Sequence, residues 1–255
     1  MKERGSRKRC FCRLDEMLVQ RGLAHTRFKA LALIMSGRVL VKGQAQTKGG
    51  SRFAMDAVLD ILPGKILKYV SRGGLKLEAA LQSLNLDVSG RIALDIGAST
   101  GGFTDCLLQA GAQLVWAVDV GKGLLDSRLR NNPKVRLMEK LNARYLMPDF
   151  FDPKPDFAVI DVSFISLTKI LPALVPCLAR PFEILAMVKP QFEAGRGQTK
   201  GGVVKDAQIR EQAIEKIRRF AEDNLSLRLA GECPSALSGP EGNVEHFLYF
   251  KNGAA

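Results

Sequence analysis

The stretch that decides the fold reads Ile92-Ala-Leu-Asp-Ile-Gly-Ala-Ser-Thr-Gly-Gly102. Its first five residues are mostly apolar and have the length of a buried strand, and its second half is rich in glycine. A strand that enters a glycine-rich turn and then a helix directs backbone N–H groups toward a ligand. The stretch therefore predicts the first strand of an open α/β sheet, with a ligand at the carboxyl end of that strand.

Short apolar strands alternate with helical segments from Gly90 onward. We expect strands at residues 92–96, 114–118, 135–138, 157–160 and 184–188, followed by a closing pair at 225–230 and 246–250. We expect helices at residues 102–110, 124–130, 167–178 and 206–224. This alternation is typical of a doubly wound α/β sheet, in which helices join the strands.

Two kinds of cofactor compete for the glycine-rich turn. A dinucleotide, as in a nicotinamide-dependent oxidoreductase, requires the spacing Gly-x-Gly-x-x-Gly, which this turn does not provide. Asp95 repels a pyrophosphate but suits the amino group of a methionine moiety. Asp119 ends the next strand, 22 positions after Gly97, where a carboxylate can accept both ribose hydroxyls of an adenosine cofactor. The alternative interpretation is a pair of exposed aspartates that bind nothing.

The form Asp-x-Gly-x-x-x-Gly of this turn resembles the first motif of S-adenosylmethionine methyltransferases. We therefore expect a cofactor site formed by Asp95, Gly97, Ser99, Thr100, Gly101 and Asp119.

Two more charged residues follow later strands of the predicted sheet. Asp161 ends the fourth strand and Lys189 ends the fifth, at the carboxyl edge where open α/β folds bind ligands. A lysine that enters a cleft after an apolar strand is partly desolvated, and a nearby carboxylate holds it in place. Such a pair can take or stabilise the proton of a poorly acidic hydroxyl. The alternative interpretation is a structural ion pair.

The net positive charge of the chain is confined to its first third. The net charge is +12, and residues 1–76 hold 17 Lys and Arg against 5 Asp and Glu, whereas residues 77–255 hold 21 of each. This concentration predicts a dedicated module for a polyanionic partner such as nucleic acid.

The longest apolar run, residues 170–179, is too short to span a membrane, and the five cysteines fit no metal-site spacing. We expect a cytoplasmic protein with no transmembrane segment and no metal.

The basic module has the pattern of two short helices followed by small strands. We expect helices at residues 13–22 and 27–36, with Thr26 as N-cap and Gly37 as C-cap, and strands at 38–42, 57–62 and 65–68. Its first helix reads Arg13-Leu-Asp-x-x-Leu-Val-x-x-Gly-Leu-Ala, and the module resembles the RNA-binding domain named after ribosomal small-subunit protein four. The resemblance implies an RNA-facing surface that includes Arg13, Thr26, Arg27, Lys29, Arg38 and Lys42. A solvated charged face is the alternative.

Longer motifs resemble one family over almost the whole chain. They are Ser71-Arg-Gly-Gly-Leu-Lys-Leu77, Asp95 to Gly102, Asp161-Val-Ser-Phe-Ile-Ser166, Val188-Lys-Pro-Gln-Phe-Glu193 and Gly242-Asn-Val-Glu245. They resemble the TlyA family of FtsJ-like ribosomal RNA 2′-O-methyltransferases, which also carries the label hemolysin. The resemblance implies a Rossmann-like methyltransferase sheet of about seven strands with the last one antiparallel. It also implies S-adenosyl-L-methionine as cofactor and ribosomal RNA or a ribosomal subunit as partner.

The resemblance further implies a catalytic tetrad of Lys76, Asp161, Lys189 and Glu245 around the target ribose. In such a tetrad, Lys189 stabilises or accepts the proton of the 2′-hydroxyl and Asp161 orients Lys189. The implied target is cytidine in large-subunit RNA, with small-subunit RNA as a second substrate. A membrane-active cytolysin is the alternative that the hemolysin label suggests, and only the basic arm fits it.

The expected domain order follows from these patterns. We expect a basic flexible arm at residues 1–12, an RNA-binding domain at 13–70 and a methyltransferase domain at 71–255. Within the last domain, the glycine-rich stretch 195–202 predicts either a mobile lid or a simple connector.

Overall fold

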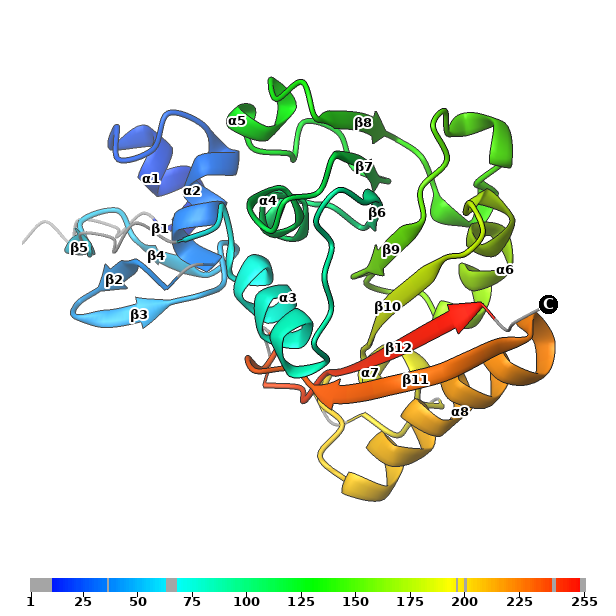
Figure 1. The fold of residues 1–255 in the computed structure, drawn as a ribbon. Coiled ribbons are helices and arrows are strands. Elements are labelled where there is room, and N and C mark those ends of the chain that lie inside the picture. The colour runs from blue at the N-terminus through cyan, green and yellow to red at the C-terminus, as the bar shows by residue number, and fades with distance from the viewer. Residues whose placement is uncertain are drawn as a thin grey trace, which may run out of the picture. The chain divides into compact units, whose positions relative to one another are not determined.

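The structure is a computed structural model that describes residues 11–35, 37–62, 68–195, 197–199, 201–239 and 242–252. The chain divides into two compact units, unit 1 at Met1–Leu67 and unit 2 at Lys68–Ala255 (Figure 1). Each unit has its own hydrophobic core.

In its described residues, unit 1 is a small α+β module with two helices and two short antiparallel sheets. Its elements are β1 (Phe11–Arg13), α1 (Leu14–Gln20), α2 (Arg27–Met35), β2 (Val39–Val41), β3 (Gln44–Gln46), β4 (Arg52–Ala54) and β5 (Leu59–Ile61). β1 pairs with β4, and β2 lies between β3 and β5. Leu14 and Leu18 of α1, Ile34 of α2 and Val39 of β2 form the centre of its core.

The ends of α2 are set by the two capping residues that the sequence predicts. The Thr26 hydroxyl accepts a hydrogen bond from the Lys29 backbone N–H at 3.1 Å. Gly37 follows the last turn with φ of 70°, a left-handed conformation that glycine adopts without steric cost. Both caps are confirmed, while the expected last residue of this helix, 36, lies outside the described residues.

The strands of unit 1 differ from the expectation in two places, and a third expected strand is not tested. Phe11 and Cys12 belong to β1 instead of the flexible arm, because they pair with β4, while the remaining arm, 1–10, lies outside the described residues. β3 and β4 were not expected, because strands of three residues carry almost no periodicity. Most of the strand expected at 65–68 also lies outside the described residues.

Unit 2 is built on a seven-stranded sheet. Its strands are β6 (Ile92–Ile96), β7 (Leu114–Asp119), β8 (Val135–Glu139), β9 (Phe157–Ile160), β10 (Glu183–Val188), β11 (Leu227–Pro234) and β12 (His246–Asn252). Their order is β11-β12-β10-β9-β6-β7-β8. β6 to β10 run parallel, and β12 is antiparallel to both of its neighbours. The predicted Rossmann-like sheet with an antiparallel last strand is confirmed.

Helices cover both faces of this sheet (Figure 1). The helices are α3 (Arg72–Ser83), α4 (Gly102–Gln109), α5 (Ser127–Arg130), α6 (Leu171–Leu174), α7 (Pro190–Glu193) and α8 (Ala207–Leu225). The 3₁₀ turns are η1 (Ala143–Tyr145), η2 (Pro148–Phe150), η3 (Leu167–Lys169) and η4 (Val175–Cys177). α3 and α4 pack on one face and α6 and α8 on the other, because alternate strand residues such as Ala93 and Leu94 enter different cores. In the described part of the chain, no helix has the length and apolar character needed to cross a membrane.

α3 is a helix that the sequence did not predict. Gly73 and Gly74 in its first turn lower the intrinsic helix propensity. Packing requires a glycine at the second of these positions, since a Cβ on Gly74 would lie 2.3 Å from the Tyr69 ring. A Cβ on Gly102 of α4 would likewise lie 2.2 Å from the Ser71 Oγ. Close contact between the starts of α3 and α4 therefore decides this part of the fold.

Two predicted helices are shorter in the structure. The helix expected at 167–178 is divided into η3, α6 and η4, because Pro172 and Pro176 have no backbone N–H to continue it. α5 begins at Ser127 instead of residue 124, because the Asp126 carboxylate caps it by accepting from the Arg128 N–H at 2.9 Å.

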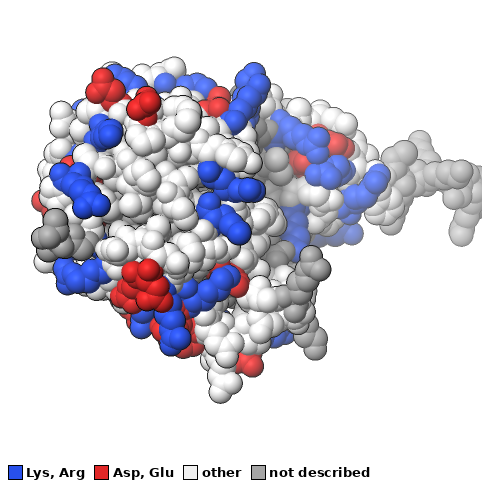
Figure 2. Space-filling model, turned by 90° about the vertical axis from the view of Figure 1, so that its right-hand side faces the viewer, with Lys and Arg blue, Asp and Glu red and all other residues white. Residues whose placement is uncertain are grey.

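The surface of unit 2 carries both basic and acidic side chains. Figure 2 shows basic and acidic side chains side by side on one face of it, with wide uncharged areas between them. This agrees with the balanced charge of residues 77–255.

Candidate active site

The carboxyl edge of the sheet gathers the charged residues that the sequence singles out. Asp95 lies near the end of β6, and Asp161 and Lys189 directly follow β9 and β10. β9 lies between β6 and β10, so the three positions are neighbours. The first residue of β12 pairs with the last residue of β10. Because the two strands are antiparallel, Glu245 enters this edge beside Lys189.

Lys189 and Asp161 form an ion pair. The Lys189 Nζ lies 2.5 Å from the Asp161 Oδ1, and the two side chains are 12% and 23% exposed. Lys189 also donates a hydrogen bond to the Ser163 Oγ at 3.1 Å. The ammonium group is therefore held at a fixed position with some of its surface open to solvent.

Lys76 and Glu245 form a second, more deeply buried pair. The Lys76 Nζ donates to the Glu245 Oε2 at 2.5 Å, and the side chains are 10% and 1% exposed. Lys76 comes from the middle of α3 and Glu245 from the residue before β12. The other Glu245 oxygen, Oε1, has no hydrogen-bond partner among the described residues. This oxygen is buried, so within the described residues its capacity to accept a hydrogen bond is unused.

Asp95 is fully buried and accepts a hydrogen bond from the Thr104 Oγ1 at 2.6 Å. Burial raises the pKa of Asp95 to about 7, and the charges of Asp161 and Asp119 act in the same direction. The hydrogen bond from Thr104 opposes this shift. The Asp95 Oδ1 has no hydrogen-bond partner in the described part of the chain. A buried, unpaired carboxylate oxygen of this kind is stabilised by a ligand cation.

Asp119 holds the glycine-rich turn in place. Its Oδ2 accepts from the Ser99 backbone N–H at 2.8 Å, and its Oδ1 accepts from the Gly121 N–H at 2.6 Å. The side chain of Ser99 stays exposed, and the carbonyl of Thr100 accepts from the Asp126 N–H at 3.2 Å. Each Asp119 oxygen keeps a lone pair for a further donor.

Gly97 and Gly101 are required by packing around the turn. Their φ angles are 88° and 96°, in the left-handed region. A Cβ on Gly97 would lie 2.3 Å from the Asp161 carbonyl oxygen, and one on Gly101 would lie 2.3 Å from a Leu129 methyl. Gly97 thus allows the end of β6 to touch the end of β9.

Two residues near the ion pair had not been singled out from the sequence. Phe164 is 90% exposed, which is unusual for such a large apolar side chain, and its ring packs on Phe192 with the centroids 4.9 Å apart. Glu193 is only 5% exposed and bonds to the loop that contains Phe164. The motifs that contain both residues were visible, but neither spacing nor composition distinguished them from their neighbours.

The expected RNA-facing residues of unit 1 fall into two groups. Arg13 and Arg27 both bond to Asp15, at 3.0 and 2.8 Å. Burial raises the pKa of Asp15, but these hydrogen bonds outweigh it and bring that pKa down to about 2. The two arginines therefore also serve the fold of unit 1.

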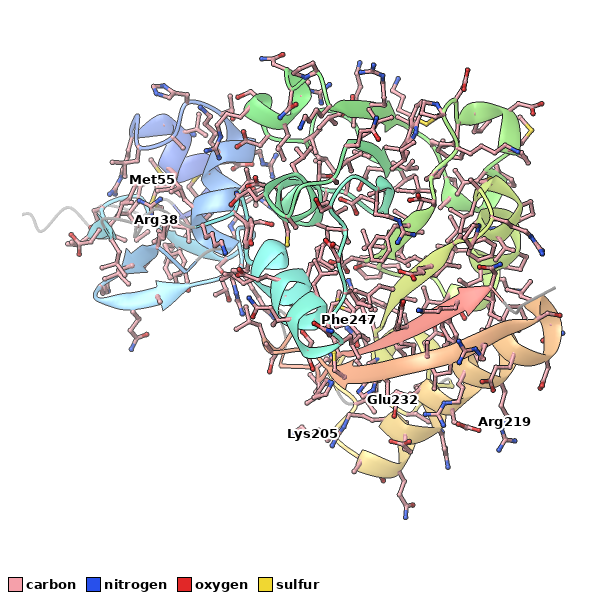
Figure 3. The ribbon with its side chains drawn as sticks, in the orientation of Figure 1. Arg38, Met55, Lys205, Arg219, Glu232 and Phe247 are labelled. Carbon is pink, nitrogen blue, oxygen red and sulfur yellow. The ribbon has the colours of Figure 1, made fainter. Side chains whose placement is uncertain are left out.

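The remaining basic residues of this group are less constrained. Arg38, labelled in Figure 3, donates to the Leu62 carbonyl at 3.1 Å. Lys29 and Lys42 are exposed and, within the described residues, make no side-chain hydrogen bond or ion pair. Their charges are available to a phosphate.

Two family profiles match the chain. The FtsJ-like methyltransferase family matches residues 69–252, and the S4 domain matches residues 12–56. This chain belongs to the FtsJ-like methyltransferase family. The resemblance inferred from the motifs is confirmed by close relatives of similar length.

One relative of this FtsJ-like methyltransferase is the 16S/23S rRNA (cytidine-2′-O)-methyltransferase TlyA of Mycobacterium tuberculosis, 44% identical over 94% of this chain and 89% of the relative. Another is Hemolysin A of Brachyspira hyodysenteriae, 40% identical over 93% of this chain and 99% of the relative. A solved structure from Streptococcus thermophilus, described as a hemolysin, matches with a TM-score of 0.75 and 43% identity over 97% of this chain and 90% of its own.

Proposed function

We propose that this chain uses S-adenosylmethionine to methylate a ribose 2′-hydroxyl of ribosomal RNA. The observation that carries this proposal is the presence of two lysine–carboxylate pairs, the half-buried Lys189–Asp161 and the buried Lys76–Glu245, at the sheet edge that also contains Asp95. The relative from Mycobacterium tuberculosis is named for cytidine 2′-O-methylation of 16S and 23S rRNA. We infer the same nucleotide here, in large-subunit RNA and also in small-subunit RNA.

The residues that would hold the cofactor fit its groups. The unpaired Asp95 Oδ1 suits the amino group of the methionine moiety, and the Asp119 oxygens suit the ribose hydroxyls. Gly97, Ser99, Thr100 and Gly101 would line the site with backbone atoms. When bound, the cofactor supplies an electrophilic methyl group on a sulfonium sulfur.

The four remaining residues would act on the target ribose. Lys189 is placed to stabilise the negative charge that develops on the 2′-oxygen, or, as a neutral amine, to accept its proton, and Asp161 keeps the Lys189 Nζ in position. Glu245 would accept a hydrogen bond from the ribose through its Oε1, while Lys76 holds the other oxygen of that carboxylate. Most of the acceleration would come from fixing two reactants in line.

Unit 1 would supply RNA affinity. A role in phosphate binding is supported by its match to the S4 domain and by its excess of basic residues. Lys29 and Lys42 of this unit are exposed. The RNA-facing surface would also include Arg13, Thr26, Arg27 and Arg38.

The test is a methylation assay with purified protein and methyl-labelled S-adenosylmethionine. Isolated 16S and 23S rRNA and both ribosomal subunits serve as substrates, and nuclease digests are analysed by mass spectrometry. We expect 2′-O-methylcytidine with the wild-type protein and none with Lys189→Ala, whose cofactor Kd changes by less than about twofold. Methylation of a base, or full activity of Lys189→Ala, would overturn the proposal.

A further inference from the structure

Two loops carry the Lys189–Asp161 pair. Loop A, residues 161–167, follows β9, and loop B, residues 189–193, contains α7. At one end, the Lys189 Nζ contacts Asp161 and the Ser163 Oγ of loop A. Both loops begin at strand ends, so their starts are fixed by the sheet. Their far ends need a separate contact.

Glu193 supplies that contact at the far end of both loops. Its Oε2 accepts a hydrogen bond from the Ser166 Oγ at 2.6 Å, and its Oε1 accepts from the Leu167 backbone N–H at 2.7 Å. Both donors belong to loop A, whereas Glu193 ends loop B, one helical turn after Lys189. The carboxylate therefore joins the two loops directly.

Lys216 of α8 supports the buried carboxylate. Its Nζ donates to the Glu193 Oε2 at 3.2 Å and to the Glu193 carbonyl oxygen at 2.9 Å. The Glu193 side chain is 2% exposed, and its two carboxylate oxygens contact three donors: the Ser166 Oγ, the Leu167 N–H and the Lys216 Nζ. The lysine side chain is 47% exposed, so it retains part of its own hydration.

Loop A contains a strained residue between its two attachments. Phe164 has φ of 65°, a left-handed conformation that a bulky residue rarely adopts. Such a conformation persists only when neighbouring contacts enforce it. The attachments are Lys189 on one side and Glu193 on the other, so loss of one attachment would let the loop relax.

We propose that Glu193 is a positioning residue, which keeps Lys189 against Asp161 and Ser163 by joining loops A and B. Glu193 touches neither reactant and acts through Lys189. The effect on methyl transfer rests on the proposed function, whereas the effect on the position of Lys189 does not.

The first test compares variants of the Glu193 contact with matched controls on α8. Glu193→Gln and Lys216→Met disturb the contact. As controls on α8, Glu215→Gln makes the same change at a partly exposed glutamate, and Arg219→Met removes an exposed cation. Glu215 and Arg219 bond to each other at 2.6 Å, and Arg219 points outward in Figure 3. We expect kcat to fall about 10- to 100-fold in Glu193→Gln, with KM for RNA and cofactor Kd within about twofold. We expect wild-type kcat in both controls, and a smaller loss in Lys216→Met.

The second test measures Lys189 without cofactor or RNA. The protein is acetylated with a limiting amine-reactive ester, and the rate at Lys189 is read by peptide mass spectrometry relative to the exposed Lys154. We expect Glu193→Gln and Glu193→Ala to raise this relative rate several-fold, and Glu215→Gln to leave it unchanged. An unchanged rate at Lys189 overturns the inference, as does a loss of kcat that Glu215→Gln shares.

The two tests separate two failures. If the wild-type protein transfers no methyl group but the acetylation rate rises as expected, the proposed function is wrong and the loop contact stands. If the wild-type protein is active and Glu193→Gln keeps its kcat, the positioning role is wrong.

Discussion

The Lys76 Nζ and the Glu245 Oε2 lie 2.5 Å apart, although 169 positions separate these residues in the chain. The contact joins the middle of α3 to the start of β12, at the edge where Lys189 and Asp161 also meet. Both charges have lost most of their hydration, so each depends on the other. The pair thus links the stability of unit 2 to the geometry of the candidate active site.

Breaking this pair should destabilise unit 2. Lys76→Met leaves the Glu245 carboxylate buried without its cation, and we expect the free energy of unfolding to fall by about 3–5 kcal/mol. The double variant Lys76→Met/Glu245→Gln removes the stranded charge and should recover part of this loss. Urea denaturation followed by fluorescence of Trp116, the single tryptophan and a core residue of unit 2, measures both. Equal losses in the single and double variants would show that charge burial is not the cause.

Cofactor affinity should depend on pH through Asp95. Because burial, with Asp161 and Asp119, raises the pKa of Asp95 to about 7, this group is largely protonated below pH 7 in the free protein. A ligand ammonium favours the ionised form, so affinity should increase as the pH rises toward 7 and then level off. Calorimetric titration with S-adenosylmethionine between about pH 5.5 and 8.5 checks this. Asp95→Asn should have a flat profile, with an affinity close to that of the wild-type protein at low pH and weaker than it above pH 7. A flat profile in the wild-type protein would contradict the assignment.

RNA affinity should fall steeply with salt. Each phosphate that a lysine neutralises contributes a slope of about −0.7 to −0.9 to the dependence of log K on log salt concentration. Lys29→Gln and Lys42→Gln should each make this slope shallower by about one, without loss of stability, because both side chains are exposed. Filter binding with ribosomal RNA at several salt concentrations measures the slope. As a contrast, Arg27→Gln should also destabilise unit 1, because Arg27 bonds to Asp15.

Phe164 should contribute to RNA binding without contributing to stability. Its ring is 90% exposed, so it offers a flat face on which a base can stack beside Lys189. Phe164→Gly removes the ring and relieves the left-handed backbone, so we expect KM for RNA to rise about tenfold while unit 2 is no less stable. Steady-state kinetics measure the KM for RNA, and thermal denaturation measures the stability of unit 2. A marked loss of stability would mean that the ring supports the loop instead.

The sequence predicted the central sheet well because its inner strands are short and mostly apolar. β6 and β9 match their predicted bounds, since residues buried on both faces of a sheet leave an unambiguous pattern. α3 escaped prediction because Gly73 and Gly74 weaken the helical pattern, and only contact with α4 and Tyr69 shows why glycine is needed there.

The sequence by itself determined the fold class, the confinement of the net positive charge to one end, and the residue types at the strand ends. Such features are local, because they depend on periodicity, composition and short motifs. Only the tertiary structure decided that Lys76 meets Glu245, that Glu193 joins two loops, and that Phe164 is exposed. These relationships arise where the sheet order brings distant segments to one edge, and no local pattern records which side chains will meet there.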